Sequence, residues 1–380
     1  MNRFHPVVFL VAALLVVGLS GSAAWAQMAA GGSGKNPVLS DPNAIVVHEV
    51  VTTQSVESFW TAERLAAAKP LPLPQPSRTS RQAPEAFARP TGPAGSFPSV
   101  GPTLRPTALA VEQVLTGQEA EYPDLATETL ELSPQAADGY TYPPPFTRYP
   151  VNSNWQMHRY FPFTAIGKLF FQIPGEPGLW TCSGAAGNQR VVWTAGHCVY
   201  TPGRGWHTNM IFIPAYKNHG DIREPFGRFT VTMMTTLAGW QNNQQAFDIA
   251  IVRVDDKDGK RLFEYTGHLG FQYNQPTERH FHAFGYPGNI VEGRFIFVCA
   301  GSLAMLDPLD GPDPIGIGCD MKHGSSGGPW IVNYRPYAFG NNNQINSVVS
   351  YGYDSQPRQF FGPYFGDGAK NLFDWGMAQN

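Results

Sequence analysis

Aromatic side chains are distributed unevenly along this chain of 380 residues. Of its 49 Phe, Tyr and Trp residues, eight precede Tyr140 and 41 lie from Tyr140 onward. Large apolar side chains supply most of the free energy gained on burial. We therefore expect a large core, and one folded domain, only in the C-terminal part, over residues 149–380.

The N-terminus has the layout of a secretory signal peptide. Arg3 precedes a 13-residue apolar run, Val7–Leu19, and small residues then lead to Ala24-Trp25-Ala26. A helix that spans a membrane needs about 20 apolar residues, so this run is too short to be an anchor. We expect residues 1–26 to be removed before Gln27, and the mature protein to be secreted, extracellular or periplasmic, without a membrane partner.

Residues 27–148 have the composition of a Pro-rich prosegment or linker. Ten of the 37 residues from Pro70 to Pro106 are proline. Such a stretch has few large apolar groups to offset its ordering entropy, so we expect it to be largely disordered. Short helical patterns at Val56–Ala68 and Ala108–Leu115 flank it. We expect this segment to be cleaved from the folded C-terminal part during maturation.

From Phe161 onward, short apolar runs alternate with Gly, Pro, Asn and Asp. The runs are rich in β-branched and aromatic residues, which is typical of strands in an all-β barrel or sandwich. Examples are Ala165–Ile173, Val191–Thr194, Met210–Ile213, Ile249–Val254, Arg294–Val298 and Ser347–Tyr351. One short helix is expected near Asp367–Met377.

Three motifs in this region carry the residue types of nucleophilic catalysis. They are TAGHC at 194–198, DIAIV at 248–252 and GSSGGP at 324–329. A serine needs an adjacent base to become a nucleophile, and histidine can take its proton near neutral pH. A buried carboxylate can then orient the histidine, while glycines beside the serine let backbone N–H groups converge on an oxyanion.

Together with Ser350-Tyr351-Gly352, these motifs resemble the trypsin-like serine proteases of the chymotrypsin fold, near the bacterial secreted V8-like and glutamyl endopeptidase branch. The resemblance covers about residues 149–380. It implies an all-β fold of two six-stranded antiparallel β-barrels with the active site between them. It also implies that His197 is the general base, Asp248 orients it and Ser326 is the nucleophile, with an oxyanion hole formed by the N–H groups of Gly324 and Ser326.

The resemblance also implies a disulfide between Cys182 and Cys198, which would brace the loop that carries the histidine. Cys299 and Cys319 are the remaining pair. The expected partners are protein or peptide substrates, bound by a monomer. A net charge of −3 offers no basic excess for nucleic acid.

The resemblance further assigns substrate-binding roles to Asp320, His323, Val349, Ser350, Tyr351 and Gly352. Asp320 lies six residues before Ser326, where a carboxylate at the base of a pocket would favour Arg or Lys in the substrate. Against this, Cys319 lies seven residues before the serine, whereas trypsin-like enzymes place a cysteine four before it. The alternative is a preference for Glu, for which His323 is the nearby histidine.

Two other functions were weighed against a serine endopeptidase. The motif G-x-S-x-G also occurs in α/β-hydrolases, but those enzymes need a histidine after the serine, and none follows Ser326. A catalytically silent, protease-like domain used for binding or adhesion is the second alternative. The presence of His197, Asp248 and Ser326 together disfavours it.

The remaining polar clusters do not predict a cofactor or a metal. His280 and His282 alternate along one strand without a third ligand at useful spacing, so we interpret both as exposed strand residues. The acidic residues of DPLDGPDP at 307–314 lack EF-hand spacing, so we interpret this segment as a surface turn. Four isolated histidines are interpreted as surface residues: His158, His207, His219 and His268.

Overall fold

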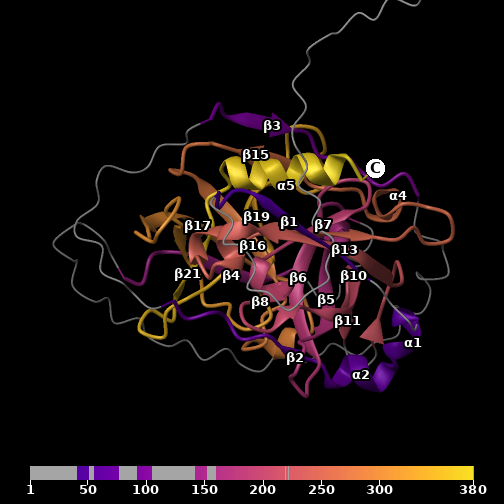
Figure 1. The fold of residues 1–380 in the computed structure, drawn as a ribbon. Coiled ribbons are helices and arrows are strands. Elements are labelled where there is room, and N and C mark those ends of the chain that lie inside the picture. The colour runs from indigo at the N-terminus through magenta and orange to yellow at the C-terminus, as the bar shows by residue number, and fades with distance from the viewer. Residues whose placement is uncertain are drawn as a thin grey trace, which may run out of the picture. The chain divides into compact units, whose positions relative to one another are not determined.

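The computed structural model describes residues 41–50, 55–76, 92–104, 142–151, 160–218, 220 and 222–379. The described residues belong to one compact unit that spans 39–380. Most of their regular structure is β-strand, as predicted, and Figure 1 shows two groups of strands with a helix across one side. Among these residues, no helix is long and apolar enough to cross a membrane.

Six antiparallel strands form the first barrel. They are β5 (Ile166–Gln172), β6 (Trp180–Ala186), β7 (Val191–Thr194), β10 (Thr208–Pro214), β13 (Phe229–Leu237) and β14 (Ala250–Val254). Their order is β13-β10-β5-β6-β7-β14, and pairing of β13 with β14 closes the ring. β-branched and aromatic side chains fit the pleated, packed surface of such strands. Every residue of β7, for example, is buried.

Six further strands form the second barrel. They are β16 (His280–Gly285), β17 (Phe297–Leu306), β18 (Ile315–Gly318), β19 (Pro329–Val332), β20 (Gln344–Val348) and β21 (Gln359–Gly362). Their order is β21-β18-β17-β16-β19-β20. The chain that continues from β20 meets β21 at an antiparallel bridge between Tyr351 and Phe361, which closes this ring. The predicted architecture of two six-stranded antiparallel barrels is confirmed.

The predicted C-terminal helix is α5 (Asp367–Met377). It buries Leu372 and Phe373, and the Phe373 ring stacks on Phe271 of β15 (Gly270–Tyr273) at 4.5 Å between centroids. The remaining elements are short: β8 (Tyr200–Thr201), β9 (Gly205–Trp206), β11 (Lys217–Asn218), β12 (Ile222–Arg223), α3 (Ala238–Gln241), α4 (Leu262–Thr266), η4 (Phe163–Ala165), η5 (Gly196–Cys198), η6 (Gln245–Phe247) and η7 (Val291–Gly293).

Parts of the Pro-rich region pack on the barrels, which differs from the disorder expected for residues 27–148. The elements are β1 (Ile45–Glu49), α1 (Val56–Phe59), α2 (Ala62–Ala67), β2 (Lys69–Pro70), β3 (Gly95–Phe97) and β4 (Thr147–Pro150). β1 pairs with β13, β2 with β6 and β4 with β17. The helical pattern at Val56–Ala68 is confirmed as α1 and α2, whereas Ala108–Leu115 lies outside the described residues.

A few large side chains anchor this N-terminal region. Trp60 is 1% exposed, its indole N–H donates to the Asn209 carbonyl at 2.6 Å, and its ring meets Phe170 of β5 edge to face. Burial of such large apolar side chains stabilises the packing of this region on the barrel surface. The covered outer face of the barrel explains why β5 is buried at nearly every position rather than at alternate ones.

Both predicted disulfides are confirmed. Cys182 of β6 is joined to Cys198 of η5, and Cys299 of β17 to Cys319 after β18, with Cα–Cα distances of 6.2 and 5.6 Å.

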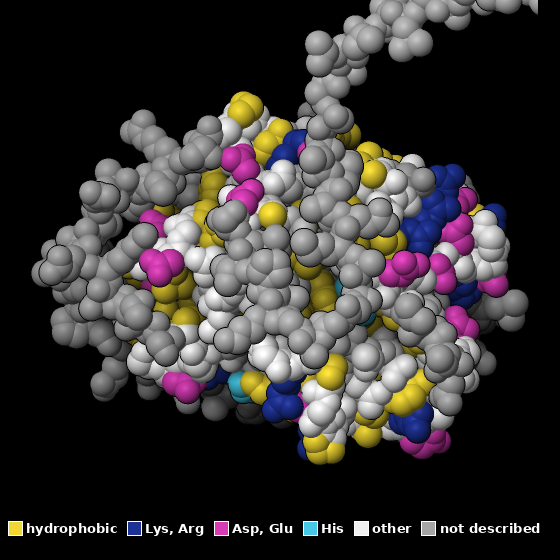
Figure 2. Space-filling model, viewed as in Figure 1, with side chains coloured by type: hydrophobic (Ala, Val, Ile, Leu, Met, Phe, Trp, Pro, Cys, Tyr) yellow, Lys and Arg dark blue, Asp and Glu magenta, His cyan; other side chains and the backbone are white. Residues whose placement is uncertain are grey.

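Acidic and basic side chains lie interspersed on the face of the molecule in Figure 2.

Candidate active site

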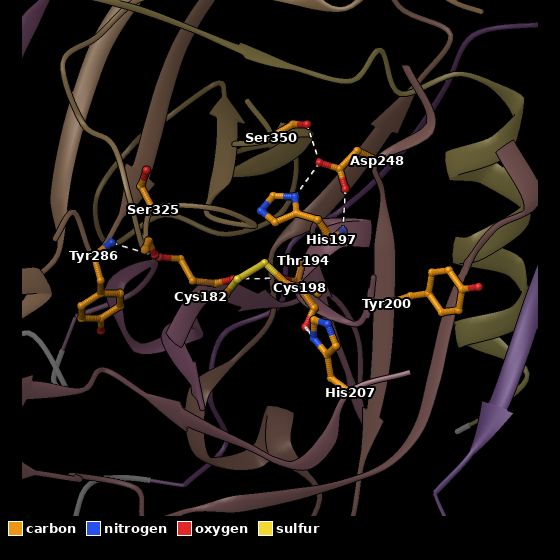
Figure 3. Close-up of a disulfide and its surroundings, with 12 residues drawn as sticks. Cys182, Thr194, His197, Cys198, Tyr200, His207, Asp248, Tyr286, Ser325 and Ser350 are labelled. Atoms are coloured by element: carbon orange, nitrogen blue, oxygen red, sulfur yellow. Dashed lines mark hydrogen bonds and ion pairs between the residues drawn. A yellow bond between two sulfur atoms is a disulfide. The ribbon is translucent and has the colours of Figure 1, made fainter. Parts of the chain in front are cut away.

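His197 and Asp248 contact each other directly. Asp248 Oδ2 lies 2.7 Å from His197 Nδ1, and Asp248 Oδ1 accepts the His197 backbone N–H at 2.7 Å (Figure 3). Both residues lie at strand ends in the first barrel, His197 after β7 and Asp248 before β14. Gly196 makes the approach possible, since a Cβ there would lie 3.0 Å from Asp248 Oδ1 and 2.7 Å from the Trp240 ring. The strand order therefore brings together two residues that are 51 apart in sequence.

Further donors surround the fully buried Asp248 carboxylate. The Ser350 hydroxyl donates to Oδ2 at 2.5 Å, and the Gln245 amide donates to Oδ2 at 3.3 Å and to Ser350 Oγ at 2.9 Å. Because a buried carboxylate requires such compensation, these bonds also fix its orientation toward His197. Ser350 was predicted to bind substrate, and here its hydroxyl binds the acid. Gln245 was missed, and its position three residues before Asp248 is no signal by itself.

Ser326 lies in the loop between β18 and β19, at the edge of the second barrel. Its Oγ is buried without a hydrogen-bond partner among the described residues, and so is His197 Nε2. Unpaired buried polar atoms are rare in proteins, and a reactive centre is one accepted reason for them. The structure thus leaves unengaged the two atoms that a proton transfer from serine to histidine would use.

Glycine is needed where the loop of Ser326 meets the first barrel. Gly327 has φ +76°, and a Cβ there would lie 2.0 Å from Thr194 Oγ1 and 2.5 Å from the Ser183 carbonyl oxygen. The backbone N–H of Ser183 donates to the Ser326 carbonyl at 2.7 Å. Close contact between the loop and strands β6 and β7 thereby places Ser326 next to the histidine loop.

Ser183, which no sequence motif indicates, connects the barrels. Its hydroxyl donates to the Gly324 carbonyl at 2.8 Å and accepts the Tyr286 backbone N–H at 2.9 Å. Its position directly after Cys182 was the available signal, because the disulfide partner of the histidine loop must lie close to the site. Ser183 thus holds the Gly324–Ser326 backbone from the first barrel.

Of the predicted oxyanion pair, Gly324 has a partner within the chain. Its N–H donates to the carbonyl oxygen of Leu71 at 2.9 Å. His323, beside it, is exposed, and its Nδ1 accepts the Leu73 backbone N–H at 3.3 Å. A Cβ on Gly352 would lie 3.7 Å from Leu73 Cδ1. Two of the predicted site residues, Gly324 and His323, therefore bind the N-terminal region, and Gly352 lies close to it.

Residues 350–352, which follow β20 and which we call the wall, have a buried support that the sequence does not indicate. Asp307 is 3% exposed, and its Oδ2 accepts the hydroxyls of Tyr351 and Tyr353 at 2.7 and 2.6 Å. The interpretation of Asp307 as part of a surface turn is therefore wrong, because the tyrosines fold over it. Val349 is also buried, and its carbonyl accepts the Gly327 N–H at 2.7 Å.

The structure argues against Asp320 as a free pocket base. Its Oδ2 forms an ion pair with Arg148 of β4, and its carbonyl accepts the Asn289 side-chain amide at 2.8 Å. Arg148 reaches it because β4 pairs with β17, a pairing that the sequence did not suggest. Oδ1 has no partner among the described residues. The charge on which a preference for Arg or Lys depended is balanced within the chain.

Two histidine predictions have different outcomes. His207 is not a surface residue: it is 1% exposed, stacks on Phe171 and lies 2.9 Å from both the Cys198 carbonyl and Thr201 Oγ1. Burial lowers the pKa of His207 to about 3. His280 is exposed, as interpreted, but the same interpretation is wrong for His282, which is half-buried. Burial, together with the neighbouring His280, lowers the pKa of His282 to about 4.

Two groups of described residues have the proximity of metal ligands. They are Cys182, His197 and Cys198, and Cys299, Cys319 and Asp320. The cysteines of both groups are joined in disulfides. A disulfide offers no thiolate, which is the form of cysteine that binds metals, so neither group fits a metal ion.

No family model matches the chain. Two solved structures are similar to it: the protease Anisep from Arthrobacter nicotinovorans and the thermostable serine protease AL20 from an extremophilic microorganism. Each is 32% identical and has a TM-score of 0.51; the matches cover 57% of this chain and 97% and 99% of those chains.

A curated extracellular metalloprotease of Bacillus subtilis (strain 168) is 27% identical over 106 residues, which is 28% of this chain and 33% of that protein. The match therefore spans about a third of that relative's length. Anisep and the serine protease AL20, by contrast, are matched over nearly their whole length, at the level of both sequence and fold. The chain belongs to the serine proteases of the trypsin and chymotrypsin fold, and is a hydrolase of peptide bonds.

Proposed function

We propose that this protein is a secreted serine endopeptidase in which Ser326 is the nucleophile, His197 the general base and Asp248 the residue that orients it. The contact of 2.7 Å between His197 Nδ1 and Asp248 Oδ2 carries the proposal. An ionised carboxylate only accepts, so Nδ1 carries the imidazole proton and Nε2 presents a lone pair. Nε2 is the buried ring atom that has no hydrogen-bond partner within the described part of the chain.

The reaction then proceeds through an acyl-enzyme. His197 Nε2 takes the proton of Ser326 as Oγ attacks the substrate carbonyl, and Asp248 stabilises the imidazolium that forms. The same proton passes to the leaving amine, and a water molecule repeats the sequence to release the acid. The oxyanion is held by the N–H groups of Gly324 and Ser326. The bond from Gly324 to the Leu71 carbonyl supports this role, because it places a carbonyl oxygen on that N–H.

Secretion is proposed from the signal-peptide pattern of residues 1–26, and two disulfides are compatible with an oxidising compartment. We propose no preference for Arg or Lys, since Arg148 pairs with Asp320. The substrates are proteins or peptides.

Single and double substitutions test the catalytic assignment. Ser326→Ala, His197→Ala and the double variant should each lose activity by a similar factor, on the order of a millionfold, because the two residues act as a unit. Ser302→Ala, at an exposed residue of β17, is the control and should retain turnover. Peptide hydrolysis that persists in Ser326→Ala, or losses that multiply in the double variant, would refute the assignment. No hydrolysis by the unaltered chain, together with no fluorophosphonate adduct on Ser326 after exhaustive labelling, would favour a silent binding domain.

A further inference from the structure

A short stretch of the N-terminal region, Lys69–Leu73, crosses between the two barrels at the candidate site. At one end, the Lys69 N–H donates to the Leu179 carbonyl at 2.8 Å, and the Leu71 N–H donates to the Thr181 carbonyl at 2.9 Å. β2 therefore runs parallel to β6 of the first barrel (Figure 1). Two residues beyond the other end, Gln75 Oε1 accepts the Asp354 N–H at 3.2 Å, just after the Ser350–Gly352 wall of the second barrel. We call Lys69–Leu73 the cleft segment.

The polar groups of the cleft segment bind the residues on which catalysis depends. The Gly324 N–H, the group that we assign to the oxyanion hole, donates to the Leu71 carbonyl at 2.9 Å. The Leu73 N–H donates to His323 Nδ1 at 3.3 Å. Pro70, Pro72 and Pro74 have no N–H, so Leu71 and Leu73 carry the only backbone donors from Pro70 to Pro74, and both are paired. The alternating sequence thus leaves no unsatisfied backbone donor in this stretch.

The fit also depends on glycines. A Cβ on Gly288 would lie 2.4 Å from Pro70 Cγ, and a Cβ on Gly324 would lie 2.9 Å from Pro70 Cβ. The backbone of the second barrel therefore lies directly against the segment. A bound substrate peptide would need the same space beside Gly324.

Leu73 occupies an apolar recess of the second barrel. It is 7% exposed and belongs to the buried apolar cluster that includes Met321 and Val349. A Cβ placed on Gly352 would lie 3.7 Å from Leu73 Cδ1, and the Leu73 N–H donates to His323 Nδ1. The side chain thus lies between the two stretches, around His323 and around Gly352, that flank Ser326.

We propose that the cleft segment is a built-in inhibitor of this enzyme. It occupies the substrate cleft, engages the Gly324 N–H with the Leu71 carbonyl, and fills an aliphatic subsite between His323 and Gly352 with Leu73. The proposal rests on the proposed function, because it assigns the Gly324 N–H to the oxyanion. The cleft accordingly binds peptides with a leucine-like side chain at this subsite, and it becomes accessible to them when the segment leaves.

Two leucine variants of the full chain test the contact of Leu73. Removing a buried leucine side chain to Cβ weakens its site by more than a factor of ten. Leu73→Ala should therefore raise the rate of peptide hydrolysis by about tenfold or more. Leu65→Ala is the matched control: Leu65 is also buried in the N-terminal region, at 3% exposure, but lies in α2 on the first barrel. Its variant should change the rate by less than about twofold. Equal rates for Leu73→Ala and the unaltered chain would overturn the proposal.

A synthetic peptide tests the same contact from outside. The hexapeptide Lys-Pro-Leu-Pro-Leu-Pro, the sequence of residues 69–74, should inhibit the Leu73→Ala variant competitively. The same peptide with Ala in place of its second Leu should inhibit at least about tenfold more weakly. Equal potency of the two peptides, or no inhibition by either, would contradict an aliphatic subsite for Leu73.

Hydrogen exchange separates this proposal from the catalytic one. In Ser326→Ala, which has no nucleophile, the amides of Leu71 and Gly324 should still be protected, and adding Leu73→Ala should speed their exchange by about tenfold or more. That result would support the inhibitory role of the cleft segment even if the catalytic assignment failed. Fast exchange of both amides in Ser326→Ala would overturn that inhibitory role, while the proposal of serine-dependent hydrolysis could still stand.

Discussion

Replacing Asp248 by Asn tests the role of its two oxygens separately. Asp248 Oδ1 accepts the backbone N–H of His197, and Oδ2 lies against Nδ1 of the same residue, both at 2.7 Å. Asparagine offers one oxygen and one NH₂ group. The backbone N–H can only donate, so the amide oxygen must take the place of Oδ1. The NH₂ group then faces Nδ1, which must accept, and the imidazole proton moves to Nε2.

A histidine in that tautomer cannot take the proton of Ser326. We therefore expect Asp248→Asn to fold but to lose about 10⁴ in kcat, or about 5 kcal/mol of transition-state stabilisation. Turnover of a peptide substrate measures the loss, and a thermal melt checks the fold. Asp256→Asn is the control, because Asp256 pairs with Arg190 at the surface, away from His197. A folded Asp248→Asn variant with kcat within tenfold of the unaltered chain would refute the tautomer argument.

Two further predictions concern stability. Replacing Cys182 and Cys198 together by Ser opens a loop with a sequence separation of 16 and should lower the free energy of unfolding by about 3 kcal/mol in the chain-entropy model; urea denaturation that shows no loss would contradict this. Burial lowers the pKa of His207 to about 3, whereas an exposed histidine titrates near 6.5, so the unfolded chain binds more protons between these values and stability falls as the pH drops through this range. From pH 7 to pH 5, the titration of His207 should lower the free energy of unfolding by about 2 kcal/mol. In His207→Gln, the decrease in the free energy of unfolding over this pH range, measured by urea denaturation, should be smaller by that amount. An equal decrease in both proteins would contradict the prediction.

The parts of the site that could be predicted are those whose chemistry requires particular residue types. His197, Asp248 and Ser326 stand in three sequence motifs, and the roles that we propose for them are a base, an orienting acid and a nucleophile; the structure brings His197 and Asp248 to 2.7 Å. The strands could be predicted because each strand of the two barrels is a short run rich in buried β-branched and aromatic residues. The pairing of Cys182 with Cys198 followed from the resemblance to a protease family and is confirmed.

Other features depend on contacts between distant segments, which composition does not reveal. Proline content predicted disorder for the region that includes Trp60 and Leu73, yet each of these side chains is buried by strands far along the chain. Asp320 has the position of a pocket base, but Arg148, 172 residues earlier, balances its charge. His207 has no motif around it, and its burial follows from the Phe171 ring and the carbonyl of Cys198.

The central claim is that Ser326 is the nucleophile, and covalent labelling tests it most directly. The chain should be labelled to completion with a fluorophosphonate, digested and analysed by mass spectrometry. We predict a single adduct on Ser326, and none in His197→Ala, because the serine is a poor nucleophile without its base. An adduct on the adjacent Ser325, whose hydroxyl donates to the Lys322 carbonyl, or no adduct in a chain that still hydrolyses peptides, would contradict the account.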